Sequence, residues 1–268
     1  RKYYRCSVKW LRYLLGEGLL YRLYRRRIIK EIEGLAKPQH VAMILDGNRR
    51  WAKLRALESS AHGHRAGADK ILEFLSWCEE QGVEVVTLYL LSSDNLGARD
   101  PSELDDLALI IENLADQLSR FSNWRVKHVG NREALPPHLQ DTLSGATERT
   151  SRNSGLHINL AVGYGGREEI TQAVARLVEK HKDSGGTLAN LPESISVQAI
   201  ADHLYTQGQP DPDLVIRTSG EQRLSDFMLW QSAHSEFYFV EALGPDLREI
   251  DFLRALRDFG TRQRRYGQ

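Results

Sequence analysis

The sequence has few of the features that mark disulfide-stabilised, zinc-binding or membrane-spanning proteins. Only two cysteines occur among its 268 residues, Cys6 and Cys78, and they lie far apart. This excludes a disulfide framework and a zinc site built on paired cysteines, and it fits a reducing cytoplasm. No stretch approaches the roughly 18 consecutive apolar residues that a membrane-spanning helix needs. The nine histidines are scattered without metal-ligand spacing.

An excess of charge of one sign is also missing, because 36 lysines and arginines balance 36 aspartates and glutamates. A net charge of zero argues against general nucleic-acid binding, so we expect no nucleic-acid partner. The sequence has no Walker loop and no GxGxxG motif after a predicted strand, which disfavours a nucleotide-binding protein or a phosphatase on a similar sheet. The hydrophobic share of 41% is typical of a globular protein with a sizeable core.

The amino-terminal part departs from this balance. Residues 1–30 contain ten lysines and arginines and a single acid, Glu17, interleaved with aromatic and aliphatic residues. This pattern predicts a basic amphipathic helical extension over residues 1–38. Two interpretations stay open: residues 1–35 bind peripherally to the inner face of a membrane, or they pack on the protein with a solvated basic face. The remainder, residues 39–268, would be the main, cytoplasmic domain.

Predicted strands and helices alternate beyond residue 38. Apolar runs predict strands over residues 41–45, 83–91, 124–129, 156–162, 214–216, 227–230 and 237–240. Helical periodicity and start signals predict helices over residues 64–80, 101–118, 137–150, 168–181, 198–205 and 250–259. Repeated strand–helix units form a mostly parallel sheet with helices on both faces, so we expect an α/β fold.

Polar segments follow four of these strands where each ends. Residues 46–50, 92–95, 163–167 and 217–225 contain glycines, hydroxyls, amides and arginines. Ligands bind at the carboxyl ends of parallel strands. One polar turn would be ordinary, but four in succession predict a single active-site rim for phosphate groups.

The first of these segments combines a carboxylate with an anion site. A buried strand ends at Asp46, and Gly47-Asn48 opens a helix whose free backbone N–H groups attract anions, assisted by Arg49 and Arg50. Mg²⁺ is the simplest bridge between a carboxylate and phosphates. The alternative is a plain helix turn capped by Asp46 and Asn48.

The last segment places two arginines and a hydroxyl around a glycine. Arg217 and Arg223 are six residues apart on either side of Gly220, and Ser225 follows. Arginine forks suit phosphate oxygens, so a second diphosphate would fit here. The alternative is a structural salt-bridge cluster with neighbouring acids.

Five motifs carry a family resemblance. They are Asp46-Gly47-Asn48-x-Arg50-Trp51-Ala52, Gly63-His64-x-x-Gly67, Ser92-x-x-Asn95, Asn159-x-Ala161-x-x-Tyr164-Gly165-Gly166-Arg167, and the segment from Asp213 to Ser225. In this order they resemble the motifs of the cis-prenyltransferases, the undecaprenyl diphosphate synthase-like enzymes. The resemblance covers residues 39–267. No aspartate-rich DDxxD pattern occurs, so the trans-type prenyl synthases do not match.

The resemblance implies a single catalytic domain with a central, mostly parallel six-stranded sheet, flanking helices and a hydrophobic tunnel. It also implies a homodimer that condenses isopentenyl diphosphate with an allylic diphosphate, geranyl or farnesyl, creates a Z double bond and releases pyrophosphate. A long-chain polyprenyl diphosphate synthase is the alternative. A non-catalytic partner subunit is a further alternative, which the presence of Asp46 and Asn48 disfavours.

The resemblance also assigns roles to residues. Mg²⁺ would be held by Asp46, with Glu236 at a second acidic position. The catalytic candidates are Asp46, Asn48, Ser92 and Asn95. The substrate-binding candidates are Gly47, Asn48, Arg49, Arg50, Trp51, His64, Arg99, Arg217, Arg223, Ser225, Arg265 and Gly267. Of these, Arg265-Tyr266-Gly267 would reach the isopentenyl site across the dimer interface.

Several positions depart from the family pattern. Arg49 replaces the usual glycine, and the loop over residues 53–62 carries an extra residue. Leu90 stands at a tunnel position that is small in long-chain enzymes, where a leucine would stop elongation early. Together with Arg49, Leu96 and residues 209–213, this leucine favours the short-chain Z-farnesyl diphosphate synthase subgroup. The alternative is that Leu90 is ordinary core.

Overall fold

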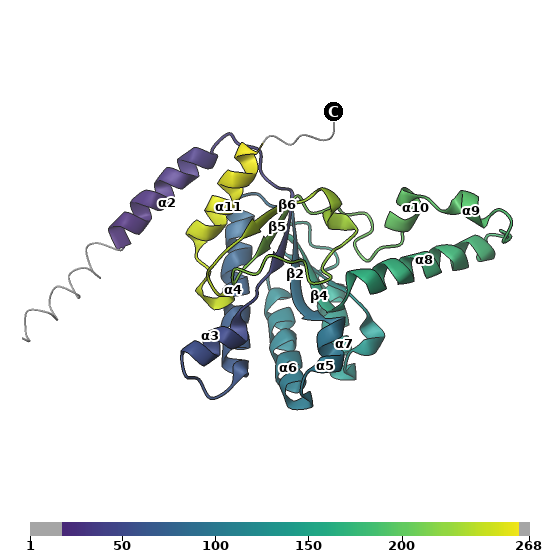
Figure 1. Cartoon of the computed structure of the whole chain (residues 1–268), viewed down its shortest axis with the longest axis horizontal. Coiled ribbons are helices and arrows are strands. Elements are labelled where there is room, and N and C mark those ends of the chain that lie inside the picture. Colours follow the sequence, from purple (N-terminus) through teal and green to yellow (C-terminus); the bar gives the residue numbers. More distant parts are fainter. Residues whose placement is uncertain (1–17, 263–268) are drawn as a thin grey trace, which may run out of the picture. The chain divides into compact units, whose positions relative to one another are not determined.

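The computed structural model describes residues 18–262, and its centre is one six-stranded sheet (Figure 1). The strands are β1 (His40–Ile44), β2 (Val85–Ser92), β3 (Arg125–Val129), β4 (His157–Tyr164), β5 (Leu214–Arg217) and β6 (Glu236–Phe239). Their order across the sheet is β3-β4-β2-β1-β5-β6, and all neighbours are parallel. The predicted α/β fold with a six-stranded, mostly parallel sheet is confirmed.

The helices follow the predicted alternation. They are α2 (Gly18–Ile32), α3 (Asn48–Leu54), α4 (Ser60–Glu80), α5 (Ser93–Ala98), α6 (Pro101–Leu118), α7 (Pro137–Thr150), α8 (Gly166–Asp183), α9 (Leu191–Ser194), α10 (Val197–Ala201) and α11 (Glu249–Thr261). Short 3₁₀ turns are η2 (Arg132–Ala134), η3 (Gln231–His234) and η4 (Gly244–Asp246). Helix α6 packs between α4 and α7, and α9 and α10 lie along α8.

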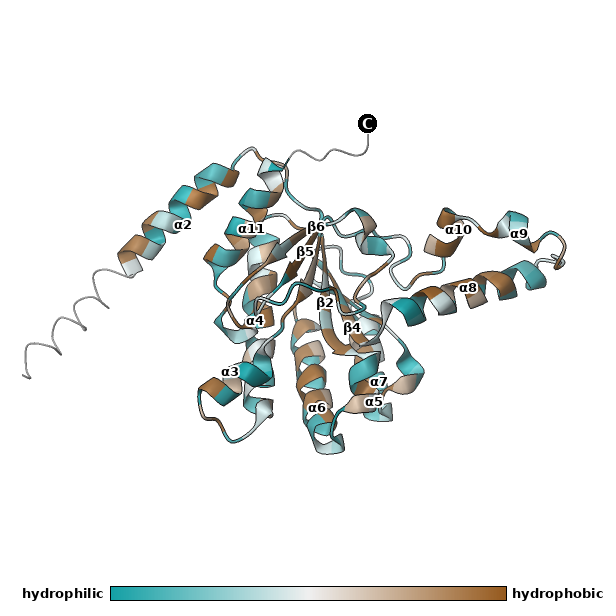
Figure 2. Cartoon of the chain, viewed as in Figure 1, coloured by the Kyte–Doolittle hydropathy of each residue, from teal (hydrophilic) through white to brown (hydrophobic). Residues whose placement is uncertain are grey.

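The central strands are buried on both faces. Every residue of β1 and β5 is buried, and the strands are predominantly hydrophobic in Figure 2. Near-continuous apolar runs are what a parallel sheet with helices on both faces requires. The strand predicted over residues 227–230 is wrong. Asp226 and Met228 have φ values of 63° and 47°, which are incompatible with extended backbone, so this segment turns instead.

The described residues divide into two compact units, residues 38–247 and residues 18–37 with 248–262. In the second unit α2 packs on α11, where Arg25 pairs with Glu249 at 2.6 Å and Arg257 pairs with Glu31 at 3.2 Å. Everything described below for the sheet and its cavities belongs to the first unit. The predicted division into residues 1–38 and 39–268 stays a prediction.

A buried carboxylate joins β4, α8 and the chain that follows α10. Glu169 is 0% exposed and accepts hydrogen bonds from Tyr164 Oη at 2.5 Å and from Tyr205 N at 2.8 Å. The Gln231 amide lies 3.1 Å from Glu169 Oε2, which brings η3 to the same point. A charge buried at this depth is tolerated only because several donors surround it.

We predict that Glu169→Ala lowers the free energy of unfolding by about 3 kcal/mol, because each buried donor left without an acceptor costs roughly 1–3 kcal/mol. Urea unfolding followed by circular dichroism measures the change. Glu179→Ala, an exposed position on the same helix, is the control and should change stability by less than about 0.5 kcal/mol. Equal transition midpoints for the two variants would contradict the prediction.

Candidate active site

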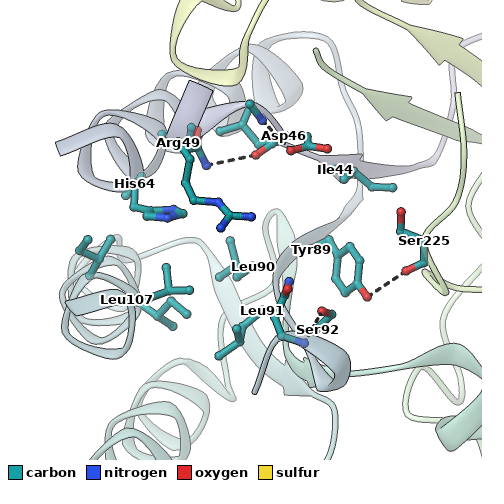
Figure 3. A pocket seen from close by; sticks show the side chains of 18 of the residues that line it. Ile44, Asp46, Arg49, His64, Tyr89, Leu90, Leu91, Ser92, Leu107 and Ser225 are labelled. Carbon is teal, nitrogen blue, oxygen red and sulfur yellow. Dashed lines mark hydrogen bonds between the residues drawn. The ribbon is translucent and has the colours of Figure 1, made fainter. Parts of the chain in front are cut away.

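A cavity of about 600 Å³ opens at the carboxyl ends of β1, β2 and β5 (Figure 3). This is where ligands bind in open parallel sheets. Its rim is polar, formed by Asp46, Gly47, Asn48, Arg49, Arg50, His64, Ser92, Asp94, Asn95, Arg99, Arg217, Arg223 and Ser225. Its floor is apolar, formed by Ala68 and Ile71 of α4 and by Leu107, Ile110, Ile111 and Leu114 of α6. The fold thus brings together residues from segments that are up to 179 positions apart in the chain, Asp46 to Ser225.

An ion pair between β1 and β5 fixes the centre of the rim. Arg217 Nη2 lies 2.7 Å from Asp46 Oδ2, and the arginine side chain is only 4% exposed. Asp46 Oδ1 accepts from the Gly47 amide at 2.6 Å. The Asp46 backbone is held too, since Thr218 Oγ1 lies 2.8 Å from both its N and its O. The carboxylate is thus oriented before any ligand binds, with its side chain 38% exposed to the cavity.

The start of α3 is shaped by close packing against α4. Gly47 has a φ of 95°, in the left-handed region, where a side chain would also lie 2.8 Å from Leu243. A Cβ at Gly63 would lie 2.0 Å from Asn48 O, and one at Gly67 would lie 2.6 Å from Asn48 Oδ1. Only glycines at these places allow α3 to begin here.

Asn48 lines the cavity and carries a buried polar atom without a partner among the described residues. Its Nδ2 donates to Leu45 O at 3.2 Å, whereas its buried Oδ1 has no hydrogen-bond partner among residues 18–262. The first intrahelical bond runs from Trp51 N to Gly47 O at 2.8 Å. The backbone N–H groups of residues 48–50 therefore have no acceptor within the helix and are available to an anion.

Glu103 organises three basic residues of the rim. Its Oε1 lies 3.1 Å from Arg99 Nη1 and 3.5 Å from His64 Nε2, and its Oε2 lies 3.9 Å from Arg49 Nη1. Burial, followed by the charge of Arg99, lowers the pKa of His64, so the imidazole is neutral at pH 7. Arg49 extends into the cavity in Figure 3. The sequence analysis missed Glu103, although it follows Arg99 by four residues on what becomes the first turn of α6.

The end of β5 and the segment that follows it hold the second pair of arginines, Arg217 and Arg223. Arg217 Nη1 donates to Ser225 Oγ at 2.9 Å and to the Arg223 carbonyl. Glu221 pairs with Arg223 and, at 3.2 Å, with Arg50. Backbone strain concentrates here, because four of the five non-glycine residues with positive φ in the described chain are Ser219, Ser225, Asp226 and Met228.

Strand β2 forms one wall through a β-bulge. Tyr89 aligns with Ala161 and Leu91 with Val162, which leaves Leu90 as the additional residue. Leu90 lines the cavity between the rim and the apolar floor (Figure 3). Tyr89, which the sequence analysis did not identify, also lines it and donates from its hydroxyl to Ser225 O at 3.1 Å.

Ser92 and Asn95 lie at the start of α5. Ser92 Oγ accepts from the Asn95 amide at 3.1 Å and so caps the helix. Both residues also line the cavity. Asp94 between them lines it as well and was not predicted.

Two predicted site residues lie elsewhere. The Trp51 indole donates to Asp246 at 2.9 Å and stacks under Arg55, and it does not line the cavity. Glu236 begins β6 and aligns through Leu214 with Val41, so it lies five positions before Asp46 along the strand direction, roughly 16 Å at about 3.3 Å per residue. Within one chain Glu236 therefore cannot share a metal ion with Asp46. Arg265 and Gly267 lie outside the described residues.

The side chains available as ligands decide whether a metal ion could bind here. Residues 18–262 contain no group of three or more histidine, cysteine, aspartate or glutamate side chains that could enclose a metal ion. Mg²⁺ does not require such a cage, because it commonly binds through one or two carboxylates together with substrate phosphates and water. Asp46, oriented and open to the cavity, fits that mode.

Comparison with known proteins identifies the family. A family model described as "Putative undecaprenyl diphosphate synthase" matches residues 44–267. The (2Z,6E)-farnesyl diphosphate synthase of Thermobifida fusca (strain YX) is 56% identical over 248 residues, covering 92% of this chain and 97% of that protein. The (2Z,6E)-farnesyl diphosphate synthase of Mycobacterium tuberculosis (strain CDC 1551 / Oshkosh) is 48% identical over 255 residues, covering 93% and 96%.

A solved structure agrees with the sequence matches. The crystal structure of lavandulyl diphosphate synthase from Lavandula x intermedia, in complex with dimethylallyl diphosphate, has a TM-score of 0.79 and 37% sequence identity. It covers 87% of this chain and 99% of that one. The resemblance seen in the sequence motifs is confirmed: this chain belongs to the undecaprenyl diphosphate synthase family, the cis-prenyltransferases.

Proposed function

We propose that this protein condenses isopentenyl diphosphate with an allylic diphosphate, geranyl or farnesyl, to give a short-chain Z-prenyl diphosphate. One observation carries the proposal: two groups of arginines flank a single oriented carboxylate, Asp46, at the mouth of an apolar cavity. Two diphosphates need two basic subsites, and a hydrocarbon chain needs an apolar one. The names of the relatives described above support the same reaction.

The two subsites have different protein partners. The allylic diphosphate would bind the amides at the start of α3 together with Arg49, His64 and Arg99. Isopentenyl diphosphate would bind Arg217, Arg223 and Ser225. Arginine forks orient both phosphate groups, which holds the reacting carbons together and removes the entropic cost of their encounter.

Departure of the allylic diphosphate sets up the bond formation. The allylic C–O bond breaks, a new C–C bond forms to isopentenyl diphosphate, and a proton leaves the latter. Bound Mg²⁺, held by Asp46, would neutralise the charge that develops on the departing pyrophosphate. Asn48, Ser92 and Asn95 line the cavity beside this point and would orient the groups that receive the proton. The neutral His64 would donate a hydrogen bond to the diphosphate without adding charge.

We predict that Asp46→Ala lowers kcat at least about 100-fold, because an electrostatic group aimed at a developing charge contributes on this scale. The rate of condensation would be measured with labelled isopentenyl diphosphate, geranyl or farnesyl diphosphate, and Mg²⁺. Circular dichroism would show whether the variant is folded. Asp105→Ala, at an exposed position on α6, is the control and should retain activity. Full activity of Asp46→Ala would remove this residue from the mechanism, and no condensation by the wild type would overturn the proposal.

Product length is assigned to the bulged residue of β2. Leu90 stands between the phosphate rim and the floor formed by α4 and α6, so its side chain limits how deep a growing chain can reach. We assign a (Z,E)-farnesyl product on this basis, and the names of the relatives from Thermobifida fusca and Mycobacterium tuberculosis support it.

Leu90→Ala should lengthen the main product by at least one five-carbon unit, because removing the side chain deepens the apolar space. Chromatographic sizing of the dephosphorylated products measures this. Leu109→Ala, 53% exposed on α6, is the matched leucine truncation and should leave the distribution unchanged. An unchanged distribution in Leu90→Ala would assign the limit to another residue.

The working form is proposed to be a homodimer in which Arg265-Tyr266-Gly267 completes the isopentenyl site of the partner. Sedimentation velocity of the full chain tests this, and a monomer at assay concentration would contradict it.

We place the enzyme in the cytoplasm, peripherally on the inner face of the membrane. Among the residues that the structure describes, no helix combines the length and hydrophobicity needed to cross a bilayer. Leu19, Leu20 and Leu23 of α2 are 58%, 67% and 52% exposed beside several arginines, a composition that suits an anionic lipid surface. Replacing the three leucines by serine should abolish cosedimentation with anionic vesicles, and unchanged cosedimentation would exclude this contact.

A further inference from the structure

A second cavity, of about 320 Å³, lies at the amino end of β3, which is an edge strand of the sheet. It is remote from the first cavity, which opens at the carboxyl ends of the strands. Its lining includes Arg125, Lys127, Thr147, Ser151, His157 and Gln209. None of the described residues that line it is acidic.

The sheet register brings the basic residues together. Arg125 of β3 aligns with His157 of β4, and Lys127 aligns with Asn159. Side chains of aligned residues in neighbouring strands point to the same face, and residues two apart on one strand share that face. Arg125, Lys127 and His157 therefore converge on one side of the sheet edge.

A partly buried hydrogen-bonded chain ends at His157. Gln209 lies 3.4 Å from His157 Nε2 and exchanges two hydrogen bonds with Asn159, at 2.6 and 3.1 Å. Asn159 donates to Thr87 Oγ1 at 3.0 Å, which lies 2.8 Å from His40 Nε2. The imidazole is thus held by a network that crosses β1, β2 and β4.

The positive charge in this cavity is not neutralised by the protein. Arg125 has no ion pair within residues 18–262. Lys127 Nζ donates to the Tyr205 carbonyl at 2.7 Å. Glu169 is the acid whose charge raises the pKa of Lys127, but its carboxylate already accepts hydrogen bonds from Tyr164 and Gln231. Burial, followed by Arg125 and Lys127, lowers the pKa of His157 to about 4. An arginine, a lysine and an uncharged histidine thus face a space with no carboxylate.

We propose that this cavity binds a small free oxyanion of the phosphate class. The guanidinium fork of Arg125 and the ammonium of Lys127 supply charge-assisted hydrogen bonds of the kind that phosphate oxygens accept. A volume of about 320 Å³ is at the lower end for ligand pockets, which favours an inorganic anion over the phosphate group of a larger molecule. The site does not depend on the function proposed above, since it shares no residue with the first cavity.

His157 provides a local reporter. A bound dianion stabilises the imidazolium form, so the pKa of His157 should rise when the site fills. The carbon-bound protons of its ring, assigned by comparison with His157→Gln, would be followed by NMR between pH 4 and 8. Inorganic phosphate would be titrated at constant ionic strength against chloride.

We expect saturable shifts of the His157 signals with phosphate and none with chloride. Arg125→Gln should weaken phosphate binding at least tenfold, and Arg125→Lys should weaken it less because the charge is kept. Arg132→Gln, an exposed arginine just past the other end of the same strand, is the matched control and should bind like the wild type. Arg223→Gln, which alters only the first cavity, should leave the His157 titration unchanged.

Three outcomes would overturn the inference. Absence of a phosphate-dependent shift at His157 would show that no anion binds there. Equal affinity in Arg125→Gln and Arg132→Gln would show that Arg125 is not a ligand. A shift with glycerol 3-phosphate but not with inorganic phosphate would contradict the assignment of a free anion.

Discussion

The ion pair between Asp46 and Arg217 is the constraint on which the rest of the site depends. Register places Arg217 beside Ile44, so the two strand ends adjoin and the arginine is almost fully buried. A buried guanidinium without a carboxylate would be strongly destabilising, which ties the end of β1 to the end of β5. Arg217 then holds the Arg223 carbonyl and Ser225 Oγ, so the strained loop that carries the second arginine is positioned by the same charge.

The other arginines of the rim follow the same rule. Glu103 holds Arg99 and approaches Arg49, and Glu221 holds Arg50 and Arg223. Each arginine is thus oriented by a carboxylate before a diphosphate arrives, which lowers the ordering entropy that binding must overcome. The second cavity differs in this respect, because Arg125 and Lys127 line it side by side without a carboxylate.

Most of the fold and much of the rim could be predicted from the sequence. Apolar runs located all six strands, and polar residues after three of them located the rim, because parallel strands bring their carboxyl ends to one edge. Residues 163–167, which were predicted to join this rim, do not line the cavity. The side-chain directions could not be predicted. Trp51 follows the Asp46 motif in sequence, yet its indole faces Asp246, and Glu236 begins a strand rather than following one. Glu103 and Tyr89 were not identified from the sequence, because the spacing of residues along the chain does not show which side chains pack together.

By itself, the sequence determined the α/β class, the glycine turn after Asp46 and the family motifs, because these depend on local chemistry and hydrophobic periodicity. The tertiary structure decided which residues meet. Strand order places β5 beside β1 although about 170 residues separate them, an outcome of packing rather than of any local pattern. It also decided that Arg49 points into the cavity, 3.9 Å from Glu103, and that the bulged residue of β2, Leu90, lines the same cavity.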